Sequence, residues 1–300
     1  MLRSISNRAR LLRFSLAFVL GLVGLCQTFP CSAQPGDAKA APKTITLNTL
    51  SMEVNALQAL SQFQLDKVQL ERFQKFGEES AQKERTRKPA KASKEYRDKM
   101  VALRKALQDA KDGDLIQKLN EEVDVLHEKE KPTVDDRVDI TEAARKHAVE
   151  AYRLLKPGQV AAYLGRIAEN IADPVDRLLD AMEDVREMKD DEWKAQGKEI
   201  ADDISRIAAG LDAVKSKRVS DQVSAFLARA RGLSKVEFQK QQGDLEKAAS
   251  KIVGDIPAEV LLKNQVELDL ATLISNPRLP QASRAMLKVV SDTKTQTSKK

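Results

Sequence analysis

Two histidines are the side chains of this 300-residue chain that could take up or release a proton near neutral pH. His127 has Asp124 and Glu128 close by on a helix, whereas the two residues before His147 are basic and repel cations. A metal site needs three or four ligands that converge on one point. One histidine beside carboxylates on a surface helix does not supply that convergence. We therefore expect no metal ligand in this chain.

An acidic run in the second half could be mistaken for a carboxylate site. Helical spacing spreads the run over one outward face, and the ligand loop of a calcium site, with its turn glycine, is absent from the sequence. The run consists of Asp176, Asp180, Glu183, Asp184, Glu187, Asp190, Asp191 and Glu192. The sequence also lacks a nucleophile elbow, a phosphate-binding glycine loop and a metalloprotease signature. We expect no catalytic residue and no cofactor, and a hydrolase built from carboxylates alone is the enzymatic alternative.

A basic stretch in the first half is the strongest charge feature. It could contact anionic lipid headgroups, acidic clients or cell-wall polymers, or it could be a solvated loop between helices. Aromatic residues do not interleave it, which argues against stacking of single-stranded nucleic acid. Its residues are Lys83, Arg85, Arg87, Lys88, Lys91 and Lys94.

The first 33 residues have the pattern of a secretory signal peptide. Four arginines precede an apolar run from Phe14 to Cys26, and Cys31-Ser32-Ala33 supplies small residues for cleavage near Ala33. The apolar run of 13 residues is shorter than the roughly 20 that span a bilayer. We expect a periplasmic or secreted protein with no stable membrane span after cleavage.

Cleavage after Ala33 would change the chemistry and the charge of the chain. It would remove both cysteines, so that a disulfide or a thiolate site is excluded. Four of the 51 basic residues are arginines of the leader, so that the remaining chain, with 45 acidic residues, is near neutral at about +2. The basic isoelectric point is therefore poor support for nucleic-acid binding.

Beyond the leader, the pattern predicts an all-α protein of antiparallel helical hairpins or a bundle. Apolar residues recur at spacings of three and four, and good helix formers dominate. We expect residues 34–43 and 291–300 to be disordered, an N-terminal helical domain over 44–172 and a C-terminal helical domain over 173–290. The predicted helices cover residues 47–76, 94–111, 114–131 and 135–156, then begin at Pro157 and at Asp173-Pro174, and continue to Val290 with breaks near Gly210, Arg218, Gly232, Gly254 and Asn276-Pro277. The residues of the first helix expected to face the core are Leu50, Val54, Leu57, Leu60, Val68, Phe73 and Phe76. The apolar side of the third helix is expected to consist of Leu115, Leu119, Val123 and Leu126.

The second domain contains an internal repeat of 45 residues. Each unit reads as helix, tight break and helix, so that this part is expected to be a duplicated helix-turn-helix unit. The matched pairs are Asp176 with Asp221, Met182 with Leu227, Arg186 with Arg231, Met188 with Leu233, Trp193 with Phe238, Ile200 with Leu245 and Ile207 with Ile252.

One short motif recurs four times: an apolar residue, a polar residue, two variable residues, Gln or Glu, and an apolar residue. The copies begin at Leu60, Leu155, Met188 and Leu233. Serine at a helix N-cap can accept a hydrogen bond from the backbone amide three residues on, and Gln or Glu at that third position can accept from the N-cap amide in return. We expect the last three copies to begin helices and the Leu60 copy to lie within one.

Two of these copies carry a resemblance to a known family. The motifs, on a helix-rich and cysteine-free segment behind a signal peptide, are Leu60-Ser61-x-x-Gln64 and Leu155-Lys156-Pro157-Gly158-Gln159. The segment of residues 45–170 resembles the LTxxQ periplasmic proteins typified by Spy and CpxP, with Ser61 and Lys156 in place of the motif threonine. The resemblance implies a small helical envelope protein that acts as an ATP-independent chaperone or a stress sensor.

Two non-enzymatic functions follow as hypotheses. The first is an exported helical binding protein, chaperone-like or related to envelope stress, whose partners are unfolded clients. The second is a scaffolding protein that binds one specific envelope protein or a second copy of itself, which the repeat and the mixed-charge faces favour.

Overall fold

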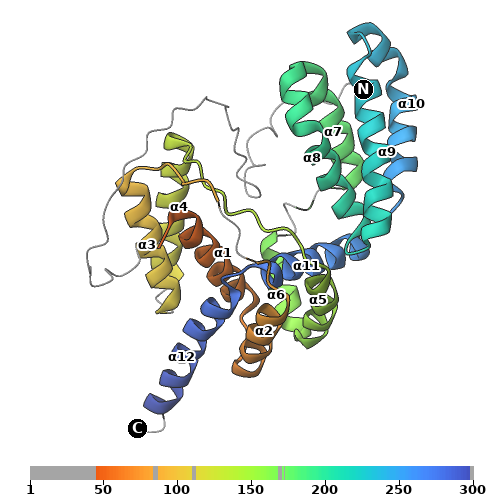
Figure 1. Cartoon of the computed structure of the whole chain (residues 1–300). Coiled ribbons are helices and arrows are strands. Elements are labelled where there is room, and N and C mark those ends of the chain that lie inside the picture. Colours follow the sequence, from red (N-terminus) through yellow and green to blue (C-terminus); the bar gives the residue numbers. More distant parts are fainter. Residues whose placement is uncertain (1–44, 84–86, 110–112, 168–170, 172, 298–300) are drawn as a thin grey trace, which may run out of the picture. The chain divides into compact units, whose positions relative to one another are not determined.

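The protein is α-helical, as its apolar periodicity predicts. The computed structural model describes residues 45–83, 87–109, 113–167, 171 and 173–297. Twelve helices and no strand lie within these ranges (Figure 1). The predicted signal peptide (residues 1–33) and the predicted disordered leader (residues 34–43) lie outside the described residues. No helix in the described ranges is both long enough and apolar enough to cross a lipid bilayer.

The helices divide into two compact units, each of which takes residues from separate parts of the chain. Unit 1 draws on residues up to Ser61, on Lys83–Val138 and on Pro277 onward, and unit 2 comprises Gln62–Gln82 and Asp139–Asn276. This division differs from the boundary predicted between residues 172 and 173, because helices close in sequence pack with helices distant from them.

Unit 1 contains the paired helices α3 (Lys94–Gln108) and α4 (Gly113–Glu130) and most of α1 (Leu47–Phe63). It also contains α12 (Leu279–Thr297), which packs against α3. The buried side of α1 includes polar residues: Ser51 Oγ donates to Asp136 (2.6 Å), and Gln108 donates to Glu53 (2.8 Å). The predicted core residues Leu50, Val54, Leu57 and Leu60 of α1 are all buried.

Unit 2 is organised around α11 (Ala258–Ser275), which packs against α2 (Lys67–Ser80), α5 (Glu142–Leu154), α6 (Pro157–Ile167) and α8 (Asp190–Ala209). Apolar residues occur on all sides of α11, as expected for a helix surrounded by others. Its buried apolar residues are Leu261, Val266, Leu268, Leu270, Ala271, Leu273 and Ile274.

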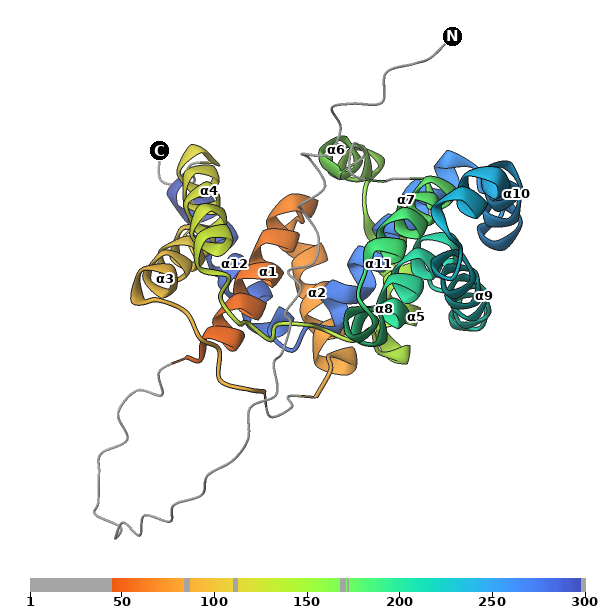
Figure 2. The same cartoon turned by 90° about the horizontal axis from the view of Figure 1, so that it is seen from above.

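The four helices α7 (Pro174–Glu187), α8, α9 (Ala213–Arg231) and α10 (Lys235–Val253) of unit 2 lie side by side and share one apolar core (Figures 1 and 2). The 45-residue repeat maps α7 onto α9 and α8 onto α10. Met182 and its counterpart Leu227 are both in this core. The Arg186 guanidinium lies 4.1 Å from the ring centre of Phe238, and Arg231 donates to the carbonyl of Met188 (3.0 Å), so that each hairpin's arginine reaches the other hairpin.

Five features differ from the predicted helices, and the first three are helix boundaries or breaks. The helix expected over 47–76 is broken after Phe63, and Val68 beyond the break is 69% exposed rather than in the core. The helix expected from residue 135 begins at Glu142, because Thr141 caps it and the preceding segment bonds to other parts of the chain. The predicted break near Arg218 is absent, since α9 runs through it.

The other two differences lie at a face and at an end. Leu115, expected on the apolar side of its helix, is 43% exposed, because the buried side of α4 is carried by Val123 and Leu126. α12 continues to Thr297, so that the tail expected to be disordered from Ser291 is helical through that residue.

Candidate functional site

The glutamines of the two motifs that resemble the LTxxQ pattern are hydrogen-bonded to each other within unit 2, although 95 residues separate them. The Gln159 side-chain amide donates to the backbone carbonyl of Gln64 (2.7 Å) and to the side-chain carbonyl of Gln69 (2.9 Å). We call the group formed by Gln62, Gln64, Asp66, Gln69, Lys156 and Gln159 the motif junction. It is the place where sequence-predicted residues from both motifs come together.

The second motif begins a helix, as predicted. Leu155 is buried at the C-cap of α5, and Pro157 is the first residue of α6, where its missing N–H costs nothing. The Lys156 amide donates to the Gln159 side-chain carbonyl (2.8 Å), which is the return half of a capping box. Gln159 therefore caps its own helix with its oxygen and binds the distant turn with its nitrogen.

The first motif ends a helix, contrary to the expectation that it lies within one. Leu60 is buried and Ser61 exposed in the last turn of α1, and Gln64 follows with φ of +50°. Only a few per cent of residues other than glycine adopt this left-handed conformation. The segment contains neither Gly nor Pro, the two residues that most often mark a helix break.

A capping box that sequence reasoning missed begins the next helix. The amide of Gln69 donates to the Asp66 carboxylate (3.0 Å), and the Asp66 amide donates to the Gln69 side chain (2.9 Å). This backbone bond, followed by the ion pair to Lys156 (2.9 Å), lowers the pKa of Asp66. The signal was available as Asp-x-x-Gln before an apolar residue, but the surrounding helical pattern concealed it.

A partly buried polar pair lies beside the motif junction. Tyr163 of α6 stacks on Phe63, with 4.1 Å between ring centres, and its hydroxyl donates to Asp269 of α11 (2.7 Å). Gln265 donates to the other oxygen of the same carboxylate (2.9 Å). Burial raises the pKa of Asp269 to about 6, and burial with the neighbouring carboxylate raises the pKa of Tyr163, which therefore stays a neutral donor.

We expect Asp269→Asn to stabilise the protein more at pH 7.5 than at pH 5, with a difference of about 1–2 kcal/mol between the two pH values. The raised pKa means that the folded state holds the proton more tightly than the unfolded state. The stabilisation that protonated Asp269 provides is complete below the unfolded pKa of about 3.9 and is lost as pH rises through about 6. Asparagine is neutral at both values and keeps an oxygen for the Tyr163 hydroxyl.

Thermal unfolding at pH 5, 6 and 7.5 measures this effect. The control is Asp221→Asn, which removes an exposed carboxylate from the same unit. The same effect of Asp269→Asn on stability at pH 5 and at pH 7.5 would contradict the expectation, since it would mean that the charge of Asp269 is not the source of the cost.

The basic stretch does not present a uniform charged surface. Lys83, Lys88, Lys91 and Lys94 are exposed, and Arg85 lies outside the described residues. The Arg87 guanidinium, only 9% exposed, donates to the carboxylate and carbonyl of Asp135 (both 2.8 Å) and to the carbonyl of Arg137 (3.0 Å). Arg87 is thereby committed to holding two connecting segments of unit 1 together.

The backbone completes this attachment. The amides and carbonyls of Lys91 and Thr133 exchange bonds (3.2 and 3.0 Å), and Asn48 of α1 bonds to both segments through the carbonyl of Lys88 and the amide of Asp135. The basic stretch is therefore a connecting segment held by hydrogen bonds of Arg87, Asn48 and the Lys91 backbone, and its lysine side chains are exposed to solvent.

We expect Arg87→Gln to destabilise unit 1 by about 1–3 kcal/mol, because it removes the charge-assisted bonds that the largely buried guanidinium makes to Asp135 and Arg137. Lys88→Gln is the matched control, since this neighbouring side chain is exposed. Urea unfolding followed by hydrogen exchange of α3 and α4 amides measures the difference. Equal midpoints for the two variants would show that the connecting segment is held by its backbone alone.

The other sequence candidates for chemistry lie apart from the motif junction. Tyr96 Oη lies 3.4 Å from Nδ1 of His127, while His147 packs edge-on against Phe76 and lies 3.7 Å from a Glu79 oxygen. Within the described ranges, no group of three or more His, Cys, Asp and Glu side chains could hold a metal ion. The acidic run is exposed except for Glu192, which caps α8, as expected for a solvated face.

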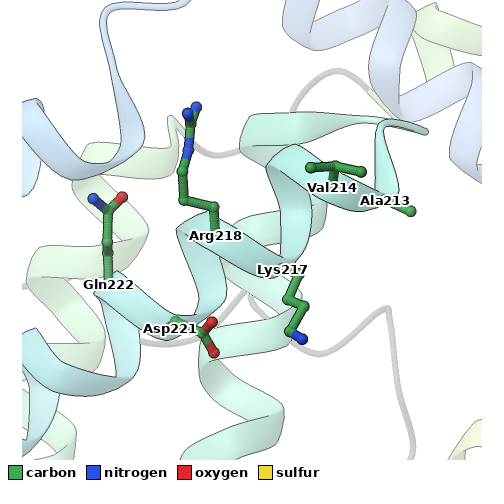
Figure 3. Close-up of a pocket in the computed structure, with 6 residues that line it drawn as sticks. All are labelled: Ala213, Val214, Lys217, Arg218, Asp221 and Gln222. Atoms are coloured by element: carbon green, nitrogen blue, oxygen red, sulfur yellow. The ribbon is translucent and has the colours of Figure 1, made fainter.

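A shallow hollow of about 480 Å³ lies along the first turns of α9 (Figure 3). Val214 is 83% exposed there, the most exposed large apolar side chain of the described residues. The hollow is lined by Ala213, Val214, Lys217, Arg218, Asp221 and Gln222. It combines an apolar end with a charged rim, and no sequence signal pointed to it.

The fold and these sites can be set beside known proteins. Comparisons of the chain with protein-family models, with curated proteins and with solved structures found no match.

Proposed function

We propose that this protein is an exported, non-enzymatic helical binding protein that acts on other proteins of the cell envelope as an ATP-independent chaperone. Three features support the proposal: the signal-peptide pattern, the two motifs that resemble the LTxxQ family, and an apolar surface rimmed by charge. The observation that carries it is the α9 hollow, with Val214 almost fully exposed beside Lys217 and Arg218.

Such a surface suits weak binding of partly folded chains. Exposed apolar side chains gain from covering an exposed apolar segment of a client, and the charged rim keeps the binding protein itself soluble. A shallow hollow confines no particular side chain, so that the selection would be for apolar character rather than for sequence. Release then needs only the client's own folding, which removes the apolar segment from water.

The test is light scattering from an unfolding client with and without the mature protein, in the absence of ATP. Several-fold molar excess of the protein should slow the growth of scattering. Val214→Ser should weaken this effect, while Val68→Ser, an equally conservative change at another exposed valine, should leave it unchanged. Equal scattering with and without the wild-type protein would defeat the proposal.

Export has its own test. The mature protein should be recovered from the periplasm or the medium with an N-terminus near Gln34, which follows the small residues at 32 and 33. An intact N-terminus recovered from the cytosol would overturn the export part of the proposal and leave the client-binding part open to the scattering assay.

A scaffolding role is the second candidate, and the duplicated α7–α10 hairpins favour it, because repeated helical units commonly provide extended binding surfaces. Light scattering across a concentration series, with a pull-down from envelope extract, separates the two roles. A stoichiometric partner or a defined oligomer supports scaffolding, whereas a monomer that only retards client aggregation supports the chaperone.

A further inference from the structure

The segment Gln64–Asp66 interrupts what the sequence describes as one helix. The residues on either side are good helix formers without Gly or Pro, and α1 and α2 are separated by only three residues. Gln64 has the left-handed backbone conformation, which side chains other than glycine disfavour. The Asp66 capping box starts α2 at this point, and contacts from outside the segment also hold the turn.

The holding contacts come from α6 and from the residue before it. Gln159 donates to the Gln64 carbonyl (2.7 Å), Arg166 donates to the Gln62 carbonyl, and Lys156 pairs with Asp66 (2.9 Å). In a continuous helix, the carbonyls of Gln62 and Gln64 would accept from amides four residues further on. The α6 side chains occupy the acceptors that helix continuation needs.

We propose that residues 64–66 form a two-state helix joint and that Gln159, with Lys156 and Arg166, is the clamp that selects the bent state. When the clamp is released, α1 and α2 join as one helix through this segment. The joint and its clamp residues all lie in unit 2, and the two states give the protein a built-in conformational switch.

The substitution Gln159→Glu removes the clamp on Gln64 but keeps the capping bond at the start of α6. A carboxylate can still accept from the Lys156 amide, so that α6 keeps its capping box, but it cannot donate to the Gln64 carbonyl. Any change at the joint is then due to the lost clamp and not to a frayed α6. Amide hydrogen exchange read by NMR or mass spectrometry measures the joint directly.

Lys67 is the reporting amide. As the first residue of α2, it has no acceptor within that helix, whereas in a continuous helix it would donate to the carbonyl of Phe63. We expect its exchange in Gln159→Glu to be at least about tenfold slower than in the wild type, with exchange in α7–α10 unchanged. Ser234→Ala, which removes a cap at the start of α10, is the control and should leave Lys67 unchanged.

A second variant tests the direction of the equilibrium. Gly at position 64 adopts the left-handed conformation without penalty, so that Gln64→Gly added to Gln159→Glu should return the bent state and fast exchange at Lys67. Unchanged or faster exchange at Lys67 in Gln159→Glu alone would overturn the proposal, since the Asp66 capping box would then hold the turn without help from α6.

Discussion

Leu227→Ala should lower the free energy of unfolding of the α7–α10 core by about 2–5 kcal/mol. Leu227 is fully buried at the centre of this core, and its counterpart in the other hairpin, Met182, is buried as well. Removing its branched end loses apolar burial and leaves a cavity. Because α9 packs against α7, α8 and α10, these helices cannot easily move to fill the cavity, and the expected loss is therefore large.

The single tryptophan makes this measurement local. Trp193 packs against the same core, so that its fluorescence in urea follows the unfolding of α7–α10 within the full chain. Val214→Ala, on the same helix at an 83% exposed position, is the matched control and should stay within about 0.5 kcal/mol of the wild type. A loss for Leu227→Ala no greater than that of the control would show that the duplicated hairpins do not form a packed core.

Gly210→Ala should cost about 2–4 kcal/mol, more than the same substitution at Gly254. Both glycines end helices with positive φ, +60° at Gly210 and +85° at Gly254, where a Cβ strains the backbone. The difference lies in the surroundings. A Cβ at Gly210 would lie 2.7 Å from the Asn264 side-chain oxygen on α11, whereas a Cβ at Gly254 meets open space.

Comparing the two alanine variants therefore separates the cost of backbone strain from the cost of the clash with Asn264. Gly254→Ala is expected to lose only the backbone component, about 1–3 kcal/mol, in thermal or urea unfolding. Gly210→Ala combined with Asn264→Ala should recover part of the additional loss, because the double variant removes the clashing amide. Equal losses at Gly210 and Gly254, with no recovery in the double variant, would contradict a close approach of α8 to α11 at this point.

The parts of the molecule that these predictions concern could be predicted from the sequence to different extents. Caps and helix ends were predictable where the signal is local: Ser234 with Glu237, Asp173 with Pro174, and the glycines at 210 and 254 all lie where their chemistry indicated. The 45-residue repeat was also visible, because duplicated apolar positions keep their spacing in any fold that buries them.

The contacts of the motif junction could be predicted from the sequence only in part. Both motifs were found from the sequence, and the helix start at Pro157 was predicted, but the break at Gln64 was not. A side chain 95 residues away donates to the carbonyl that helix continuation would use, and no local propensity records that contact. The Tyr163–Asp269 pair had no sequence signal either, because α6 and α11 meet only in the folded chain.

By itself, the sequence determined the all-α class, most helix boundaries and the duplication in the second half, since these depend on interactions within a few residues of each other. Only the tertiary structure decided which segments share a unit, that Arg87 is an internal anchor rather than a surface charge, and that the α1–α2 helix is broken. The physical reason is the same in each case. A polar donor can bond to any of several acceptors in the chain. Tertiary packing determines which of them lies within hydrogen-bond distance, about 3 Å.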